Sequence, residues 1–300
     1  MDMERELGVY ARIRSMIDQE EITEEVVRER WANYTALTHE IVVAERDGQL
    51  LGMARWGRMY YEPEGLYQIS VGVFPEFRRQ GVGRALARHV MDSRIAAGAN
   101  KLMGGCYAQF PENELFAREM GFSFKMRYVD QEVELPSSIT VPLPDGIEVE
   151  VFQAASPDDA RLQEIYDTYA EADSDEPLTR ETGVPSREVW TNYWKLADYN
   201  EGLIVVAREN GVPVGLCHSV RRQDHFDTGF TGTRRAVRGR GIAKALKVRL
   251  MQEEANRGTS KMATCNSSLN QAMLAINRTV GFHITSEFDI WEQMVPNSQS

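Results

Sequence analysis

The chain of 300 residues contains an internal repeat, and this repeat constrains the fold more than any other feature of the sequence. Three short motifs each occur twice, at spacings of 160, 160 and 163 residues: RRQGVGRAL at Arg78–Leu86 and RGRGIAKAL at Arg238–Leu246, Gly121-Phe122 and Gly281-Phe282, and Asp47–Gly52 and Asn210–Gly215. A nearly constant spacing across separate motifs is the signature of a duplicated structural unit. We therefore predict that the chain consists of two copies of one fold.

A proline-rich segment separates the two copies. Residues 134–146 read ELPSSITVPLPDG, with three prolines and a final Asp-Gly, and this composition is typical of a connection rather than of a packed core. We predict an N-terminal domain at residues 1–133, a linker at residues 134–146 and a C-terminal domain at residues 147–300.

Both copies predict the same order of secondary structure. A two-residue hairpin turn, Asp47-Gly48 or Asn210-Gly211, joins two apolar strands in each copy. A third strand follows, then a helix with an apolar residue at every fourth position, a short strand and a second helix that ends at a glycine. The pattern predicts an α+β fold in which helices flank a mixed, mostly antiparallel sheet. The second copy opens with an evident strand at residues 147–152, whereas the first copy begins with helix-like sequence and lacks this strand.

The composition excludes several classes of protein. There are 45 acidic and 34 basic residues, and a net charge of −11 disfavours nucleic acid as a partner because an acidic surface repels phosphate. Three cysteines without a CxxC pair disfavour both a disulfide framework and a zinc site, and we predict no metal. No apolar run approaches the ~20 residues of a membrane span, and the charged N-terminus lacks the apolar region of a signal peptide. We predict a cytoplasmic chain that binds no membrane.

The repeated loop has the features of a phosphate site. In both copies a strand leads through a short turn into a helix whose first residues read Arg-x-x-Gly-x-Gly/Ala. Small residues let a ligand approach the backbone, and the unpaired N–H groups and dipole of a helix N-terminus suit a pyrophosphate. A Walker loop is excluded because no Gly-Lys-Ser/Thr is present, and the third glycine of a dinucleotide fold is also missing. The alternative is a glycine-rich turn that binds no ligand. This interpretation is the weaker one because the motif occurs twice and arginines flank it in both copies.

The two loop segments, Val71–Gly83 and Thr231–Ala243, resemble motif A of the GNAT acetyltransferases. The Gly-Phe dipeptides resemble the end of motif B of the same family. The resemblance covers nearly the whole chain as a tandem pair, a layout similar to that of mycothiol synthase-type double-domain acetyltransferases. It implies two tandem GNAT-like domains and acetyl-CoA as the cofactor.

The resemblance also implies which residues contact the cofactor. The pyrophosphate would be held by backbone N–H groups of the loop, and the pantetheine arm would pair with the preceding strand, where one backbone amide would polarise the thioester carbonyl. The residues implied in the first copy are Val71, Val73, Arg78, Arg79, Gln80, Gly81, Val82, Gly83 and Arg84. The residues implied in the second copy are Thr231, Gly232, Thr233, Arg238, Gly239, Arg240, Gly241, Ile242, Ala243 and Lys244.

A proton acceptor is predicted in the second copy. An amine is mostly protonated at neutral pH, so its attack on a thioester needs a group that takes the proton. Several members of the family carry this carboxylate eleven residues before the loop, where the second copy has Asp227 and the first has Tyr67. His225 lies two residues before Asp227, so strand alternation places both on one face as a base and its orienting partner. The alternative is a solvated polar strand end.

The tyrosine that many family members use to protonate the leaving thiolate is absent. The matching positions, four residues before Gly-Phe, hold Asn277 and Ala117. A thiol with a pKa near 8.5 is an acceptable leaving group as its anion, so the absence of the tyrosine need not abolish acyl transfer. We predict that Asn277 hydrogen-bonds the cofactor and that Asn270 matches a family asparagine near the CoA arm. For either asparagine the alternative is a helix cap.

These features predict catalysis in the second copy and a non-catalytic role, in binding or support, for the first. The predicted function is an acetyl-CoA-dependent N-acetyltransferase that transfers an acyl group to the primary amine of a small molecule by direct attack in a ternary complex. The alternatives are a non-catalytic acyl-CoA-binding or sensing module, and an acetyltransferase of protein N-termini or lysines. The sequence identifies neither the acceptor nor the oligomeric state.

Overall fold

A computed structural model describes residues 3–18, 21–33, 37–59, 62–154, 159–222 and 224–296. The chain forms two compact units, the first made of Met1–Met126 with Phe288–Ser300 and the second of Arg127–Glu287. None of the helices in the described ranges is long and apolar enough to cross a membrane.

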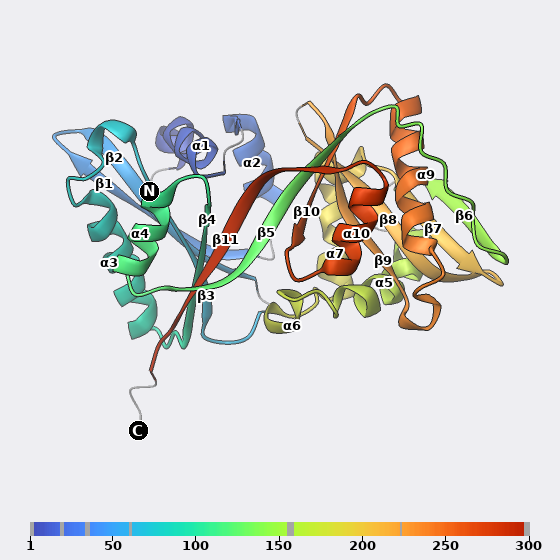
Figure 1. The fold of residues 1–300 in the computed structure, drawn as a ribbon. Helices are drawn as coiled ribbons and strands as arrows, with labels where there is room; N and C mark the ends of the chain where they lie inside the picture. Colours follow the sequence, from blue (N-terminus) through green and yellow to red (C-terminus); the bar gives the residue numbers. More distant parts are fainter. Residues whose placement is uncertain are drawn as a thin grey trace. The chain divides into compact units, whose positions relative to one another are not determined.

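The first unit is a sheet in the order β1-β2-β3-β4-β11, with helices on both faces (Figure 1). All neighbouring strands are antiparallel except β3 and β4, which are parallel. Its elements are α1 (Met3–Asp18), α2 (Glu24–Asn33), β1 (Leu37–Arg46), β2 (Gln49–Met59), β3 (Leu66–Val73), α3 (Val82–Ala96), β4 (Lys101–Tyr107), α4 (Pro111–Glu119) and the end of β11 (His283–Met294).

Alternating side chains of β2 divide the core of the first unit between the two faces of the sheet. Met53 packs with Ile13 of α1 in one cluster, while the next residue, Ala54, packs with Leu86 and Val90 of α3 in another. The apolar stripe of α3 therefore covers one face and α1 covers the other.

The second unit repeats this arrangement in the order β5-β10-β9-β8-β7-β6, again with one parallel pair, β9 and β10. Its elements are the end of β5 (Ser123–Glu134), β6 (Ile147–Phe152), α5 (Ala160–Asp173), α6 (Thr179–Thr182), α7 (Arg187–Asn192), α8 (Ala197–Asn200), β7 (Ile204–Glu209), β8 (Val212–Arg221), β9 (Phe226–Thr233), α9 (Ile242–Asn256), β10 (Lys261–Ser267) and α10 (Gln271–Thr279). On β7, Val205 joins the core under α9, whereas Ile204 and Val206 join an aromatic core under α5 and α7.

These two units confirm the predicted α+β class with a mixed sheet. Both predicted hairpin turns are present, with Asp47-Gly48 at φ 52° and 78° and Asn210-Gly211 at φ 51° and 78°, the left-handed pair that a tight two-residue turn requires. In the described part of the first unit no strand corresponds to β6, so the two copies begin differently, as their sequences indicate.

The last strand of each copy ends in the other unit. The end of β5 pairs with β10, from Ser267 opposite Tyr128 to Lys261 opposite Glu134, and the end of β11 pairs with β4 in the equivalent register. The compact units therefore differ from the predicted intervals 1–133 and 147–300. The segment predicted as a linker also differs from a free connection, because Leu135 is buried and belongs to the core of the second unit.

Candidate functional site

Each unit contains a pair of parallel strands that separate along their length. In the first unit β3 and β4 pair only over Leu66–Gln68 and Lys101–Met103, and the rest of the two strands diverges. In the second unit only Phe226 and Asp227 of β9 pair with β10. Beyond these points backbone groups face a widening gap, and unpaired backbone groups require a partner. The gap can accept an extended ligand that pairs with the strand edge.

A helix N-terminus lies beside each gap. Gly81 precedes α3 at φ 87° and Gly241 precedes α9 at φ 85°, both in the left-handed region, and the space where a Cβ would lie is open in both. The amides at 82–84 and 242–244 belong to the first turns, which have no acceptor within the helix. Each loop is therefore suited to bind an anion, in agreement with the sequence analysis.

The same arginine contact anchors both loops to the preceding strand. Arg78 Nε donates to the Val73 carbonyl at 3.1 Å, and Arg238 Nε donates to the Thr233 carbonyl at 3.4 Å. In the second unit Arg238 also pairs with Asp175 at 2.7 Å. Hydrogen bonds from Arg235 and then Arg238 hold the pKa of Asp175 at about 2, so this carboxylate is charged beside the loop.

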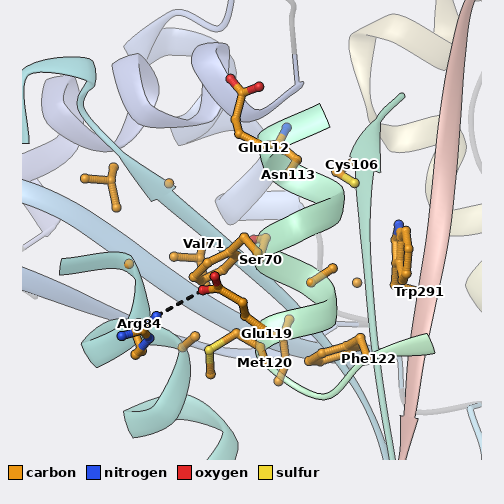
Figure 2. Close-up of a pocket in the computed structure, with 18 of the residues that line it drawn as sticks. Ser70, Val71, Arg84, Cys106, Glu112, Asn113, Glu119, Met120, Phe122 and Trp291 are labelled. Atoms are coloured by element: carbon orange, nitrogen blue, oxygen red, sulfur yellow. Dashed lines mark hydrogen bonds and ion pairs between the residues drawn. The ribbon is translucent and has the colours of Figure 1, made fainter. Parts of the chain in front are cut away.

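A cavity of about 450 Å³ occupies the gap of the first unit (Figure 2). Its walls come from β3, β4, α3, α4 and β11, and Trp291 of β11 closes one side. The predicted cofactor residues that line it are Val71, Val73, Arg78, Arg79, Gly81, Gly83 and Arg84. Two further predicted residues lie elsewhere: Val82 packs in the core, and the Gln80 amide donates to the Glu76 carbonyl at 3.1 Å.

Small side chains make this cavity open. Ala87 of α3, Gly104 and Gly105 of β4, and Ala117 of α4 all line it. Cys106 also lines it, and burial, with a further contribution from Asp289, raises the pKa of its thiol to about 11. Arg84 and Glu119 form an ion pair of 3.0 Å at the half-exposed edge (Figure 2).

A polar network stands at the corresponding place in the second unit. Lys247 and Asn277 lie 160 residues after Ala87 and Ala117, and both are fully buried. Lys247 Nζ donates to Asn277 Oδ1 at 2.5 Å. Asn277 Nδ2 in turn donates to Gln131 at 2.8 Å and to Asn266 at 2.7 Å. The amide of Asn277 is thus engaged by Lys247, Gln131 and Asn266, and its contact with the cofactor stays a prediction.

Asn270 caps a helix. Its Oδ1 accepts a hydrogen bond from the Met273 amide at 3.2 Å, at the start of α10. The structure therefore shows the capping alternative for this residue, and its side chain satisfies one of the unpaired N–H groups of the first turn.

The other predicted residues of the second unit lie along β9 and the loop. Thr231 contacts the Cys217 sulfur at 3.1 Å, and Gly232 passes so close to α5 that a Cβ would lie 2.6 Å from Ala172. In the loop, Arg240 pairs with Glu209 at 2.9 Å, while Ile242 is buried in the core. Gly239 is left-handed at φ 79°, and Ala243 and Lys244 are half-buried in the first turn of α9.

Asp227 and His225 lie together at the closed end of the second gap. Asp227 accepts hydrogen bonds from Arg222 Nε at 2.5 Å and from His225 Nε2 at 3.1 Å, and His225 Nδ1 lies 2.7 Å from Asp224. Burial by itself raises the pKa of Asp227, but His225 and Arg222 outweigh it and lower the pKa. The hydrogen bond to Asp227 raises the pKa of His225. The two side chains therefore bond to each other, and their role as a base and its orienting partner stays a prediction.

Further carboxylates lie on the loop side of the second gap, where Asp175 pairs with Arg238. Burial raises the pKa of Asp173 to about 6, and Tyr169 donates to its Oδ2 at 3.1 Å. Tyr128 of β5 donates to Glu176 at 2.7 Å. These contacts were missed by sequence reasoning because a run of acidic residues does not indicate which carboxyl group is buried. Across the described ranges no group of three His, Cys, Asp or Glu side chains is arranged to hold a metal ion.

Comparison with known proteins defines the class to which this fold and site belong. Two segments, residues 10–122 and 162–282, match the Acetyltransferase (GNAT) family. Together they cover more than half of the chain, so the chain belongs to this family of acyltransferases and carries the domain twice, which confirms the tandem layout. GNAT proteins as a class use acetyl-CoA.

Particular relatives resemble the chain over different lengths. The mycothiol acetyltransferase of Salinispora arenicola is 30% identical over 130 residues, which are 42% of this chain and 40% of that protein. The chain thus matches less than half the length of this curated relative. A tandem GNAT protein from the clavulanic acid biosynthesis pathway superposes with a TM-score of 0.79 at 16% identity, over 99% of this chain and 97% of that one. A GCN5-related N-acetyltransferase from Sphaerobacter thermophilus gives a TM-score of 0.76 at 19% identity, over 97% and 93% of the two chains.

Proposed function

We propose that the protein is an acetyl-CoA-dependent N-acetyltransferase that transfers the acyl group to the primary amine of a small molecule. The observation that carries this proposal is the repeated geometry, in which a diverging pair of parallel strands opens beside a helix headed by a left-handed glycine. An extended pantetheine arm would pair with the strand edge in the gap, and a pyrophosphate would accept hydrogen bonds from the amides at the start of the helix.

The residues of the first unit fit this cofactor. The amides at 82–84 would face the pyrophosphate, the space above Gly81 is open, and the arm would run along Val71–Val73 in the cavity. When bound, acetyl-CoA supplies the activated thioester. This unit is assigned a binding role because Tyr67, at the position equivalent to Asp227, is packed edge-on against Trp56 with Arg94 over its ring.

The second unit is assigned the transfer. The acceptor amine must lose a proton before it attacks, and Asp227 with His225 is the group that takes it. His225, whose pKa Asp227 raises, takes the proton in its neutral form, and Asp227, whose pKa is lowered, stays charged and orients the ring. The backbone of Thr231–Thr233, at the open edge of β9, would stabilise the oxyanion that develops on the thioester. Carboxylates such as Asp173 and Glu176 favour a cationic acceptor.

The experiment is thiol release from acetyl-CoA with a panel of small amines. We expect Asp227→Ala to lose at least 100-fold in rate, because general base groups contribute about 10²–10⁴-fold. Asp224→Ala is the matched control: this carboxylate also contacts His225 but its side chain is 74% exposed, so a much smaller loss is expected. An unchanged rate in folded Asp227→Ala would remove this residue from the mechanism. Isotope-labelled acetyl-CoA in cell extract, read by mass spectrometry, separates small-molecule from protein acceptors.

A further inference from the structure

Lys247 is a buried cation of the second unit that has no carboxylate partner within the part of the chain that the structure describes. Only 1% of this residue is exposed, its Nζ donates to Asn277, and it lies 4.7 Å from the centroid of the Phe282 ring. The titratable group that acts on it is the Cys217 thiol. An isolated buried ammonium is costly, and an anion that comes to lie beside it lowers this cost.

The repeat aligns Lys247 with the wall of the cavity in the first unit. Ala87 and Ala117 line the cavity of the first unit, and Lys247 and Asn277 hold the equivalent positions of the second. Contacts agree with this placement, because Asn277 bonds to Asn266 on the diverging part of β10. The ammonium therefore lies beside the gap between the two strands of the second unit.

We propose that Lys247, positioned by Asn277, stabilises the negative charge that develops on the sulfur of CoA when the thioester bond breaks. This inference rests on the function proposed above. The electron pair of the carbon–sulfur bond passes to sulfur, and the Lys247 ammonium keeps its proton and pairs with the thiolate. The thiolate takes a proton from water when CoA leaves. The pair thus compensates for the missing tyrosine of many relatives, and the first unit, with alanine at both positions, lacks it.

The electrostatic surroundings suit this role. Burial lowers the pKa of Lys247 to about 8, while the Cys217 thiol acts in the opposite direction. The ammonium is therefore still charged near neutral pH, and a thiolate beside it is stabilised by the opposite charge.

The test is a titration of the thiol of bound CoA, followed by the ultraviolet absorbance of the thiolate with the desulfo-CoA complex as blank. The protein carries Gly83→Glu so that CoA binds in the second unit alone. We expect the bound thiol to titrate at least one pH unit below free CoA, because an adjacent opposite charge shifts a pKa by about 1–3 units. Lys247→Met is expected to raise it to or above the free value. Arg249→Met on the same helix, whose side chain is 51% exposed and pairs with Glu253, is expected to leave it unchanged.

Two outcomes overturn the proposal. One is a thiol pKa in Lys247→Met equal to that of the parent. The other is a bound thiol in the parent that titrates at or above free CoA, and this measurement decides the matter even if Lys247→Met does not fold. Failure of the proposed function looks different, since the Gly83→Glu protein then either does not bind CoA or binds it and releases no thiol from acetyl-CoA with any amine of the panel.

Discussion

The most quantitative prediction concerns a negative charge placed in either loop. Gly83→Glu puts a Cβ 3.4 Å from Val73 and 3.7 Å from the Phe116 ring, which are ordinary contacts, so the fold should tolerate it. Ala243→Glu is the equivalent change in the second unit. A carboxylate about 5 Å from a phosphate costs about 3 kcal/mol at an effective dielectric constant of 20. This corresponds to a loss of more than 100-fold in affinity.

Calorimetric titration with acetyl-CoA measures this effect. We expect two sites in the wild type and one in each variant. The control is Ala96→Glu, which adds the same charge at an exposed position at the other end of α3, about 20 Å away and beyond the screening length of ~8 Å. The reasoning is refuted if Gly83→Glu keeps the wild-type number of sites and affinity.

Two further predictions concern the second unit. By NMR, His225 should titrate above the ordinary histidine value, and Asp227→Asn should lower its pKa because Asp227 is the largest cause of the shift. Charged His225 then contributes its full stabilisation of the fold below about pH 6.5, and this stabilisation is lost as the pH rises through the raised pKa of His225. If Asp227→Asn leaves the pKa of His225 unchanged, Asp227 is not the cause of the shift. In urea unfolding, Asn277→Ala should cost about 3 kcal/mol because it leaves Lys247 and its amide partners unsatisfied, whereas Asn270→Ala should cost about 1 kcal/mol as a lost cap. Equal losses in the two asparagine variants would show that the buried network adds no more stability than a helix cap.

The sequence was sufficient to predict features that local chemistry determines. The turns at Asp47-Gly48 and Asn210-Gly211 need left-handed residues, and the loops need a glycine such as Gly81 before the helix, so these positions are readable from composition and spacing. The adjacency of His225 and Asp227 was readable from their spacing, although His225 lies in the bend just before β9 and not in the strand itself.

Features that depend on distant pairing were not readable. The ends of β5 and β11 could pair within their own copy or in the other unit, and the strand sequences satisfy the same hydrogen bonds in either case. The burial of Lys247 was missed because a lysine near the start of a helix ordinarily lies at the surface. The repeat did indicate that Lys247 is buried, because the equivalent residue of the first copy, Ala87, lies on the apolar face of α3.

The most direct test of the assignment of transfer to the second unit compares thiol release by Gly83→Glu and Ala243→Glu with acetyl-CoA and an accepted amine. We expect Gly83→Glu to keep most of the wild-type rate and Ala243→Glu to lose at least 100-fold at subsaturating acetyl-CoA, because only the second loop serves the reacting thioester. The opposite pattern, loss in Gly83→Glu with a wild-type rate in Ala243→Glu, would place the chemistry in the first unit and contradict the account.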